Sequence, residues 1–177
     1  EAMKKGLDFR TDFSGSMPDV VQGDTSRLRQ ILINLLANAI RYTQRGEVRL
    51  KIAYQSEIAV FEVCDTGCGI PQEDMERIFL PFERGTGAEP ASVPGTGLGL
   101  TITHRIVGLM GGSLRAESVE GQGSSFEVRL PYVPLAAAPA ETEPEGADGE
   151  PGARLTGIRV LVAEDNVYTN HIHADDL

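Results

Sequence analysis

The clearest pattern along the chain is an amphipathic helix near its start. Across residues 24–44, apolar side chains recur at three- and four-residue spacing, which predicts a helix with one buried face and with Asp24 or Thr25 as its cap. A second, apolar helix is predicted over residues 98–110, and a short helix over residues 72–78. Two long helices of this kind need a partner surface to bury their apolar faces.

Five strand-like runs supply that surface. They cover residues 7–13, 47–54, 57–64, 113–118 and 124–130. The second and third runs are joined at Gln55 and Ser56 as a predicted hairpin, so neighbouring strands are expected to pair mostly antiparallel. The predicted fold class is therefore α+β, a two-layer sandwich with helices on one face of a mixed, largely antiparallel sheet.

The pattern changes after residue 132. Residues 133–157 are rich in Pro, Ala, Gly and Glu, which predicts an extended acidic linker with little to bury. Residues 158–163 (IRVLVA) then form a short apolar run that predicts a buried strand. We therefore expect one complete domain at residues 1–132, the linker, and the opening of a second domain at residues 158–177.

Composition and charge narrow the function classes. The chain is 41% hydrophobic and 24% charged, an ordinary globular usage, and it contains no apolar run of membrane-spanning length. A net charge of -10 argues against nucleic acid or an anionic membrane as a partner and at first sight against a polyanionic ligand. The tail from residue 132 holds two arginines and nine acidic residues, so most of the acidity lies outside the main domain.

Two cysteines, Cys64 and Cys68, are too few for a disulfide framework, so we expect a reducing, cytoplasmic compartment. They flank an acidic residue and are compatible with a redox switch. The favoured interpretation is that Cys64 is a buried strand residue and Cys68 a small residue in a turn.

The first cluster with chemical potential is on the first long helix. Asn34, Asn38 and Arg41 are spaced by four and three residues, so they lie on one stripe beside the apolar face. Asparagine is a poor residue for a helix interior, and two of them within five positions favour a function. A solvated polar face is the alternative.

The second cluster is the run 65–70 (DTGCGI) at the end of a predicted strand. Its glycines allow a ligand to approach the backbone closely, and the Asp65 carboxylate can accept a hydrogen bond from an amino group. An ordinary turn has the same residues, so this motif alone is weak.

The third cluster is the run 95–100 (GTGLGL), which leads directly into the second long helix. Backbone amides without side chains at the positive end of a helix suit a phosphate group. The spacing is not that of the dinucleotide fingerprint, and the chain contains no P-loop. Any nucleotide must therefore be held by a different scaffold.

Together these segments resemble one family. Residues 34–43 (NLLANAIRYT), 65–70 (DTGCGI), 78–84 (IFLPFER) and 95–100 (GTGLGL) are similar, in order and spacing, to the N, G1, F and G2 boxes of the histidine-kinase catalytic and ATP-binding domain. That domain shares the GHKL superfamily, with its Bergerat fold, with DNA gyrase and mismatch-repair ATPases. The resemblance covers roughly residues 8–132.

The resemblance implies a role for each box residue. Asn38 would bind the magnesium ion that accompanies ATP, with Asn34 supporting it. Arg41 would reach the phosphates, Tyr42 would lie along the adenine, and Asp65 would accept the adenine amino group. Residues 85–94 would form a lid. The remaining implied ATP contacts are Gly67, Gly69, Ile70, Phe82, Arg84, Gly95, Thr96, Gly97, Leu98, Gly99 and Leu100.

One position separates kinases from hydrolases by this resemblance. ATPase branches carry a glutamate where this chain has Asn34, and an amide cannot activate water as a base. The implied chemistry is transfer of the ATP γ-phosphoryl group to a histidine on a dimerisation domain upstream. None of His104, His171 and His173 has the acceptor context, and His104 is expected to be a packing or surface residue. A GHKL-type ATPase and a nucleotide-independent docking scaffold are the alternatives.

The tail has a resemblance of its own. Residues 159–166 (RVLVAEDN) are similar to the opening strand of a response-regulator receiver, in which Glu164 and Asp165 would form part of an incomplete magnesium pocket. A linker strand with incidental carboxylates is the alternative. The implied parent is a hybrid sensor kinase, with upstream dimerisation helices and a receiver as partners and no membrane contact by this segment.

Overall fold

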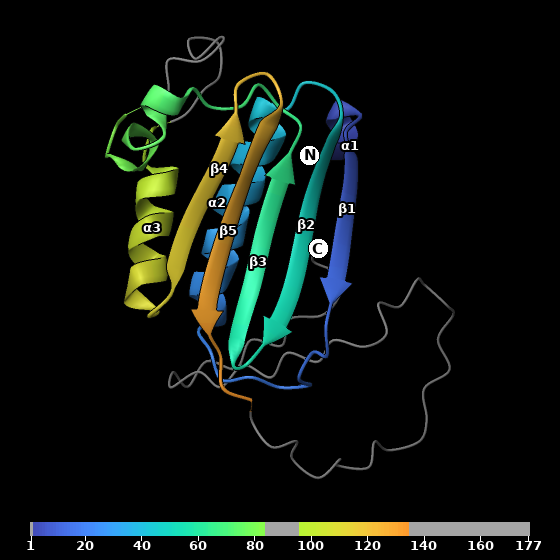
Figure 1. The fold of residues 1–177 in the computed structure, drawn as a ribbon, viewed down its shortest axis with the longest axis vertical. Helices are drawn as coiled ribbons and strands as arrows, with labels where there is room; N and C mark the ends of the chain where they lie inside the picture. The colour runs from blue at the N-terminus through green and yellow to red at the C-terminus, as the bar shows by residue number, and fades with distance from the viewer. Residues whose placement is uncertain (1, 84–95, 135–177) are drawn as a thin grey trace.

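The computed structural model describes residues 2–83 and 96–134 and contains one sheet. Its strands are β1 (Asp8–Ser14), β2 (Glu47–Gln55), β3 (Ile58–Asp65), β4 (Ser113–Val119) and β5 (Gly123–Pro131), in the spatial order β1-β2-β3-β5-β4 (Figure 1). β1 pairs with β2 in parallel, and the other three neighbouring pairs are antiparallel. The predicted mixed, largely antiparallel sheet is confirmed.

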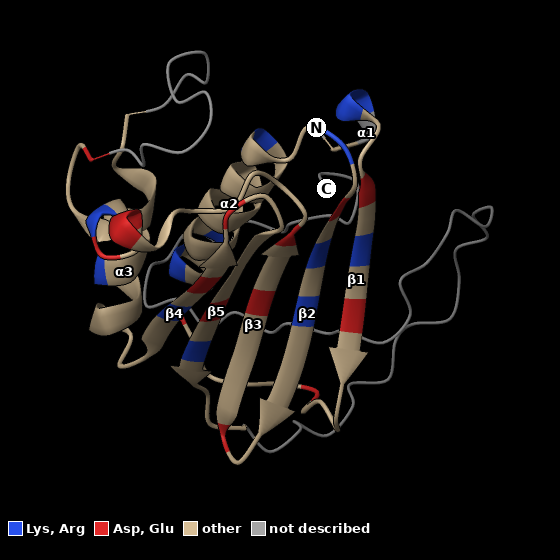
Figure 2. Ribbon diagram, turned by 45° about the horizontal axis from the view of Figure 1, so that its top comes forward, with Lys and Arg blue, Asp and Glu red and all other residues tan. Residues whose placement is uncertain are grey.

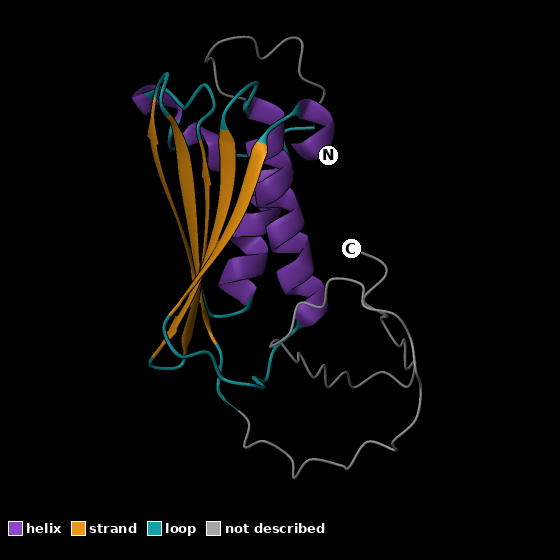
Figure 3. Ribbon diagram, turned by 90° about the vertical axis from the view of Figure 1, so that its right-hand side faces the viewer, coloured by secondary structure: helices purple, strands orange, loops and turns teal. Residues whose placement is uncertain are grey.

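The helices form the second layer. They are α1 (Ala2–Lys5), α2 (Thr25–Tyr42) and α3 (Gly99–Leu109), with two 3₁₀ turns, η1 (Gln72–Asp74) and η2 (Arg77–Phe79), between α2 and α3 in the chain. Seen edge-on, α2 and α3 lie side by side on one face of the sheet (Figure 3). Among the described helices, none combines the length and apolar character that crossing a membrane requires.

Helix α2 is placed by its cap and by one apolar stripe. The Asp24 carboxylate accepts the Arg27 backbone N–H at 2.9 Å, as an N-cap should. Ile31, Leu35 and Ala39, spaced by four residues, are buried against the sheet. At the other end, the Thr43 backbone N–H (3.1 Å) and hydroxyl (2.7 Å) both donate to the Ala39 carbonyl, and the helix stops.

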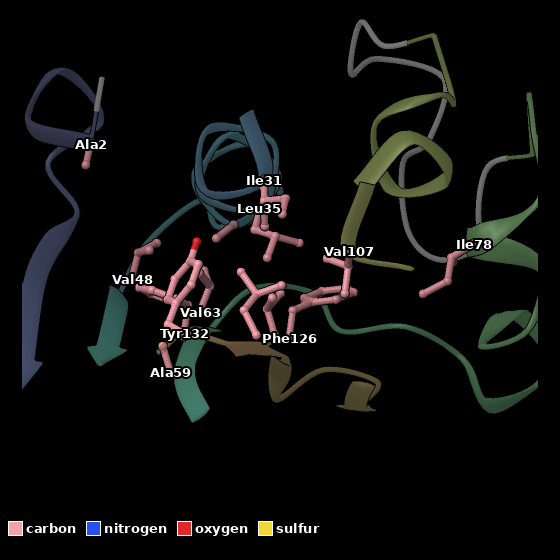
Figure 4. Close-up of a cluster of buried hydrophobic side chains, with 14 of the residues drawn as sticks. Ala2, Ile31, Leu35, Val48, Ala59, Val63, Ile78, Val107, Phe126 and Tyr132 are labelled. Atoms are coloured by element: carbon pink, nitrogen blue, oxygen red, sulfur yellow. The ribbon is translucent and has the colours of Figure 1, made fainter. Parts of the chain in front are cut away.

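The core lies between the sheet and the two long helices (Figure 4). Burial alternates over residues 58–63 of β3 and 126–131 of β5, so every second residue there points inward, as a half-buried strand requires. The inward residues are Ala59, Phe61 and Val63 of β3 and Phe126, Val128 and Leu130 of β5. Because this core is shared by α2, α3 and the central strands, it fixes the two helices relative to the ends of those strands.

The opposite face of the sheet is polar. Charged residues recur along its strands (Figure 2), and cross-strand pairs such as Lys51 Nζ to Glu62 Oε2 at 3.1 Å join neighbours. Cys64 lies on this face, half-buried, and its Sγ donates to Glu62 Oε1 at 3.2 Å. The prediction of a buried Cys64 is wrong because strand alternation places Val63 in the core and the next residue on the outer face.

Two local predictions also differ from the structure. The single short helix expected over residues 72–78 is two separate 3₁₀ turns, held by i to i+3 bonds such as Asp74 N–H to the Pro71 carbonyl at 2.9 Å. The hairpin turn is Ser56–Glu57, one residue later than predicted, and both residues have positive φ angles of 51° and 63°. A two-residue turn of this type normally contains Asn or Gly, and neither is present to mark its position.

After β5 the chain contacts the β2–β3 turn and the segment that precedes α2. The Tyr132 N–H donates to the Glu57 carbonyl at 2.8 Å, and the Gln22 N–H donates to the Val133 carbonyl at 3.0 Å. Most of the predicted linker, 133–157, and all of the predicted receiver segment, 158–177, lie outside the described residues.

The buried stripe of α2 generates a stability prediction. Leu35→Ala removes a side chain that is 1% exposed and should lower the free energy of unfolding by about 2–5 kcal/mol. Ile33→Ala, on the same helix but 58% exposed, should change it by less than about 0.5 kcal/mol. Urea unfolding followed by circular dichroism measures both, and equal losses for the two variants would contradict the orientation of α2.

Candidate functional site

Three segments distant in sequence converge at one end of the molecule. They are the last turns of α2, the loop after β3, and the first turn of α3, all at the upper end of Figure 1. The chain leaves β5 at the opposite end (Figure 1). The N, G1 and G2 segments therefore come together because α2 and β3 end, and α3 begins, at the same edge of the sandwich.

The two asparagines of α2 face α3. Asn34 Nδ2 donates to the Gly99 carbonyl at 3.4 Å and to Thr103 Oγ1 at 3.3 Å. Asn38 Nδ2 lies 4.0 Å from the position that a Cβ on Gly99 would occupy. Both asparagines are half-buried, so they do not belong to a solvated face of the helix.

The last turn of α2 presents Arg41 and Tyr42. Arg41 is half-buried, and Tyr42 is 39% exposed. Lys5 Nζ donates to the carbonyls of Ile40 (2.8 Å) and Arg41 (3.1 Å). A cation therefore binds the last carbonyl groups of α2, which lie at the negative end of the helix dipole. The last turn of α2 is thus anchored by the N-terminal segment.

The loop after β3 passes against the backbone of α2. A Cβ on Gly67 would lie 2.5 Å from the Tyr42 carbonyl oxygen, a contact that no other residue tolerates. The neighbouring Cys68 N–H donates to the same carbonyl at 3.4 Å. Gly67 therefore permits the close approach that places Asp65 beside the end of α2.

Asp65 is a desolvated carboxylate held by backbone donors. Burial raises the pKa of Asp65 above its ordinary value, and hydrogen bonds from the backbone of Gly67 (2.8 Å) and Ser124 partly oppose the increase. Two backbone donors fix the orientation of the carboxylate. Its remaining lone pairs are acceptors for a donor on a bound molecule.

The F segment crosses the entrance to α3. The Phe82 N–H donates to the Gly97 carbonyl at 3.2 Å, and a Cβ on Gly97 would lie 3.0 Å from Phe82 Cα. Phe82 has a φ of 64° and its side chain is 75% exposed. A positive φ is costly for such a residue, so the contacts with Gly97 must hold it there.

Ion pairs of Arg77 stabilise the same segment. The Arg77 guanidinium bonds Glu83 at 2.7 Å and the fully buried Asp74 at 3.2 Å. The hydrogen bond to Glu83, followed by its charge, raises the pKa of Arg77. These ion pairs link η1 and η2 to Glu83, the residue after Phe82.

The first turn of α3 offers free backbone donors. Its first intrahelical bond runs from Ile102 N–H to the Leu98 carbonyl at 2.9 Å, and no side chain caps the helix. The amides of Gly99 and Leu100 therefore have no partner within the helix and lie at its positive end. Thr96 is exposed immediately before this turn. An anion fits this arrangement.

Some predicted site residues are not part of this convergence. Arg84 and Gly95 lie outside the described residues, as do Glu164 and Asp165. Ile70 packs against the hydrophobic core, so its side chain anchors the loop to the core.

Sequence reasoning did not single out several residues that touch the site. Thr103 bonds Asn34, Ser118 bonds the Ile70 N–H at 2.8 Å, and the Gly121 N–H donates to the Cys68 carbonyl at 2.7 Å. Gly121 was detectable only as part of a hairpin turn. Nothing in the local pattern marked Ser118.

His104 is where it was expected. It is exposed on α3, and its ring centroid lies 5.6 Å from that of Phe79. The prediction of a packing or surface residue is confirmed.

Comparison with known proteins adds the family. The family model described as histidine kinase-, DNA gyrase B-, and HSP90-like ATPase matches residues 23–134. The aerobic respiration control sensor protein ArcB of Escherichia coli is 36% identical over 169 residues, which cover 93% of this chain and 21% of ArcB. The sensor protein TorS of the same organism is 40% identical over 170 residues, covering 95% of this chain and 18% of TorS. The chain thus spans about a fifth of the length of these relatives.

Solved structures show the same fold. The full-length structure of ShkA in complex with AMPPNP has a TM-score of 0.66 and 34% identity, covering 77% of this chain and 28% of ShkA. The catalytic domain of histidine kinase ThkA has a TM-score of 0.61 and 31% identity, covering 73% of this chain and 83% of that domain.

The match of the family model extends over more than half of the chain, and all four box segments lie within the matched residues. The chain therefore belongs to the histidine kinase-, DNA gyrase B- and HSP90-like ATPase family, as a catalytic domain of the sensor histidine kinase type.

Proposed function

We propose that this chain binds ATP with Mg²⁺ at the converging segments and donates the γ-phosphoryl group to a histidine on dimerisation helices of a larger protein. The observation that carries the proposal is the meeting of a desolvated carboxylate, two inward amides and an uncapped helix N-terminus at one edge of the sandwich. These are the groups that an adenine, a metal ion and a phosphate chain require.

The adenine lies at the loop after β3. Asp65 accepts the adenine amino group, and Gly67 and Gly69 allow the ring to approach the backbone closely. Tyr42 lies along the ring, a role that its exposed position at the end of α2 permits. The AMPPNP complex of the similar protein ShkA supports an adenine nucleotide as the ligand.

The phosphates lie at the first turn of α3. Backbone amides from Gly97 to Leu100 bind them without side-chain obstruction, and Arg41 supplies positive charge from α2. By the family resemblance, Arg84, Gly95 and Thr96 also contribute to ATP binding. Only a small part of the net negative charge belongs to this domain, so the acidic composition does not oppose the ligand.

The residues present fit a magnesium ion that is shared with the phosphates. No group of three or more His, Cys, Asp or Glu side chains within residues 2–83 and 96–134 could hold a metal ion by itself. Asn38, next to Gly99, provides one hard oxygen ligand, and Mg²⁺ commonly takes one or two protein ligands together with substrate phosphates. When bound, the ion neutralises the charge that develops on the transferred group.

An amide at position 34 favours transfer of the phosphoryl group over hydrolysis of ATP. Its amide donates to the Gly99 carbonyl and to Thr103, so it links α2 to α3. An amide has no basicity and cannot activate a water molecule. The site therefore holds ATP for a protein acceptor, which distinguishes this proposal from an ATPase.

We extend the proposal to the rest of the parent protein. The similarity to ArcB covers 93% of this chain, so it continues past residue 134 into the tail. This supports a hybrid kinase, with a linker at 133–157 and a receiver that opens at 158–177 and contributes Glu164 and Asp165 to its own magnesium pocket. The acceptor histidine and the dimerisation helices belong to other parts of the parent, with this domain in the cytoplasm.

Asn38→Ala tests the nucleotide site. Loss of the side chain proposed to bind the ATP-associated Mg²⁺ should abolish Mg²⁺-dependent ATP binding in calorimetry, while circular dichroism stays unchanged. Gln30→Ala, an amide-to-alanine change on an exposed position of the same helix, should bind ATP like the wild type. Undiminished binding by Asn38→Ala would refute the assignment.

Asp65→Asn tests the adenine contact and its electrostatic cost. The variant should bind ADP at least about tenfold more weakly, because a charge-assisted acceptor is lost. Without ligand it should be more stable than the wild type at pH 7. Burial raises the pKa of Asp65 in the folded state, so the wild type loses stability as pH rises from the unfolded carboxyl pKa of about 3.9 through the folded value.

The gain from Asp65→Asn should therefore disappear as the pH falls below about 3.9, where the carboxyl is protonated in both states. Urea unfolding at pH 7 and at about pH 3 measures it. A variant that is less stable than the wild type at pH 7 would show that the carboxylate stabilises the fold, contrary to this account.

A further inference from the structure

The loop after β3 rests on the turn between β4 and β5. The Gly121 N–H of this turn donates to the Cys68 carbonyl at 2.7 Å. Gly69, with a φ of 69°, lies so close to the Val119 carbonyl oxygen that a Cβ would collide with it. The turn is more than fifty residues later in the chain, yet it packs directly against the loop that follows Asp65.

Ser118 is the side chain at the centre of this contact. Its Oγ accepts the Ile70 N–H at 2.8 Å, donates to the Gly123 carbonyl at 2.9 Å and lies 3.0 Å from Ser124 Oγ. A hydroxyl has one donor and two acceptor positions, so these three contacts use its full capacity. One hydroxyl therefore joins the end of the loop to both sides of the turn.

The position of Ser118 on its strand is itself unusual. β4 alternates, and the two preceding inward residues, Leu114 and Ala116, pack against the core. A serine at the next inward position is half-buried, where a hydroxyl without partners would be unfavourable. The bond to Ile70 explains why a polar residue is accommodated there.

The same turn also reaches the start of the loop. A Cβ on Gly123 would collide with the Asp65 carbonyl oxygen, and the backbone of Ser124 bonds the Asp65 carboxylate. The turn thus contacts Asp65 at one end of the loop and Ile70 at the other. Between these two points the loop contains two glycines and no helix of its own.

We infer that Ser118 is a positioning residue for adenine recognition. Its hydroxyl fixes the end of the loop on the β4–β5 turn, and so holds Asp65 and Gly67 in the geometry that selects adenine. This inference rests on the proposed function, because it assigns the purpose of the loop to nucleotide binding. Ser118 acts through the loop and does not touch the nucleotide.

Ser118→Ala in the full chain tests the inference, with Ser113→Ala as the control. Ser113 is an exposed serine on the same strand. Ser118→Ala should weaken ADP binding about tenfold, the equivalent of about 1.4 kcal/mol or one hydrogen bond. Binding of GDP, which carries a carbonyl in place of the amino group, should change less, so the preference for ADP falls. Ser113→Ala should keep the wild-type affinities, and Ser118→Thr, which retains the hydroxyl, should restore the preference.

Amide hydrogen exchange separates positioning from a local effect. Loss of the hydroxyl removes the acceptor of the Ile70 N–H directly, so faster exchange there is expected in any case. Faster exchange at the Gly121 N–H, whose acceptor is the Cys68 carbonyl, reports that the loop after β3 and the β4–β5 turn separate more often. Unchanged Gly121 exchange in Ser118→Ala would overturn the inference.

The outcomes distinguish the two claims. If the wild type binds no ADP, the proposed function fails and this inference fails with it. If the wild type binds ADP but Ser118→Ala has the same affinity and the same preference over GDP, only the inference fails. Equal losses for ADP and GDP, or a Ser118→Thr variant that behaves like Ser118→Ala, would indicate a general structural role and would also overturn it.

Discussion

The burial of one apolar stripe of α2 is the constraint on which the rest of the site depends. Ile31, Leu35 and Ala39 lock the helix against the sheet in one rotation about its axis. Residues one position earlier, Asn34 and Asn38, then point toward α3, where they meet Gly99. Because helical geometry couples neighbouring positions, a packing requirement places two polar amides at the edge of the sandwich.

Backbone crowding is the second constraint, and it explains the glycines. At Gly67 and Gly69, any side chain would collide with backbone atoms of α2 or of the β4–β5 turn. The loop that carries Asp65 is therefore compressed between two elements that are themselves fixed by the core. A loop confined in this way can hold a desolvated carboxylate in one orientation, which favours specific recognition over flexible binding.

Much of this arrangement could be predicted from the sequence. The three- and four-residue spacing in α2 and the alternation in β3 and β5 are strong periodic signals, and they gave the helices, the strands and the fold class. The four boxes gave the family, because their order and spacing are specific together. The hairpin turn at Ser56 and Glu57 was not predictable, because no Gly or Asn marks it. The two 3₁₀ turns were not predictable, because they are too short to show a full helical period.

Contacts between distant segments were also hidden from the sequence. Ser118 and Gly121 appear in the chain as parts of a simple hairpin, and only the register of β3, β5 and β4 brings them to the loop after β3. Cys64 illustrates the same limit at short range, because a one-residue step along a strand decides between the core and the outer face.

We propose that an adenine nucleotide occupies the edge where α2, the loop after β3 and α3 meet. Amide NMR of the full chain titrated with ADP and Mg²⁺ tests it most directly. Saturable chemical-shift changes are expected at Asn38, residues 65–70 and residues 97–100, with none at Gln22 and Val133 near the opposite end. Changes centred on the Gln22 and Val133 end, or no saturable change with ADP, would contradict it.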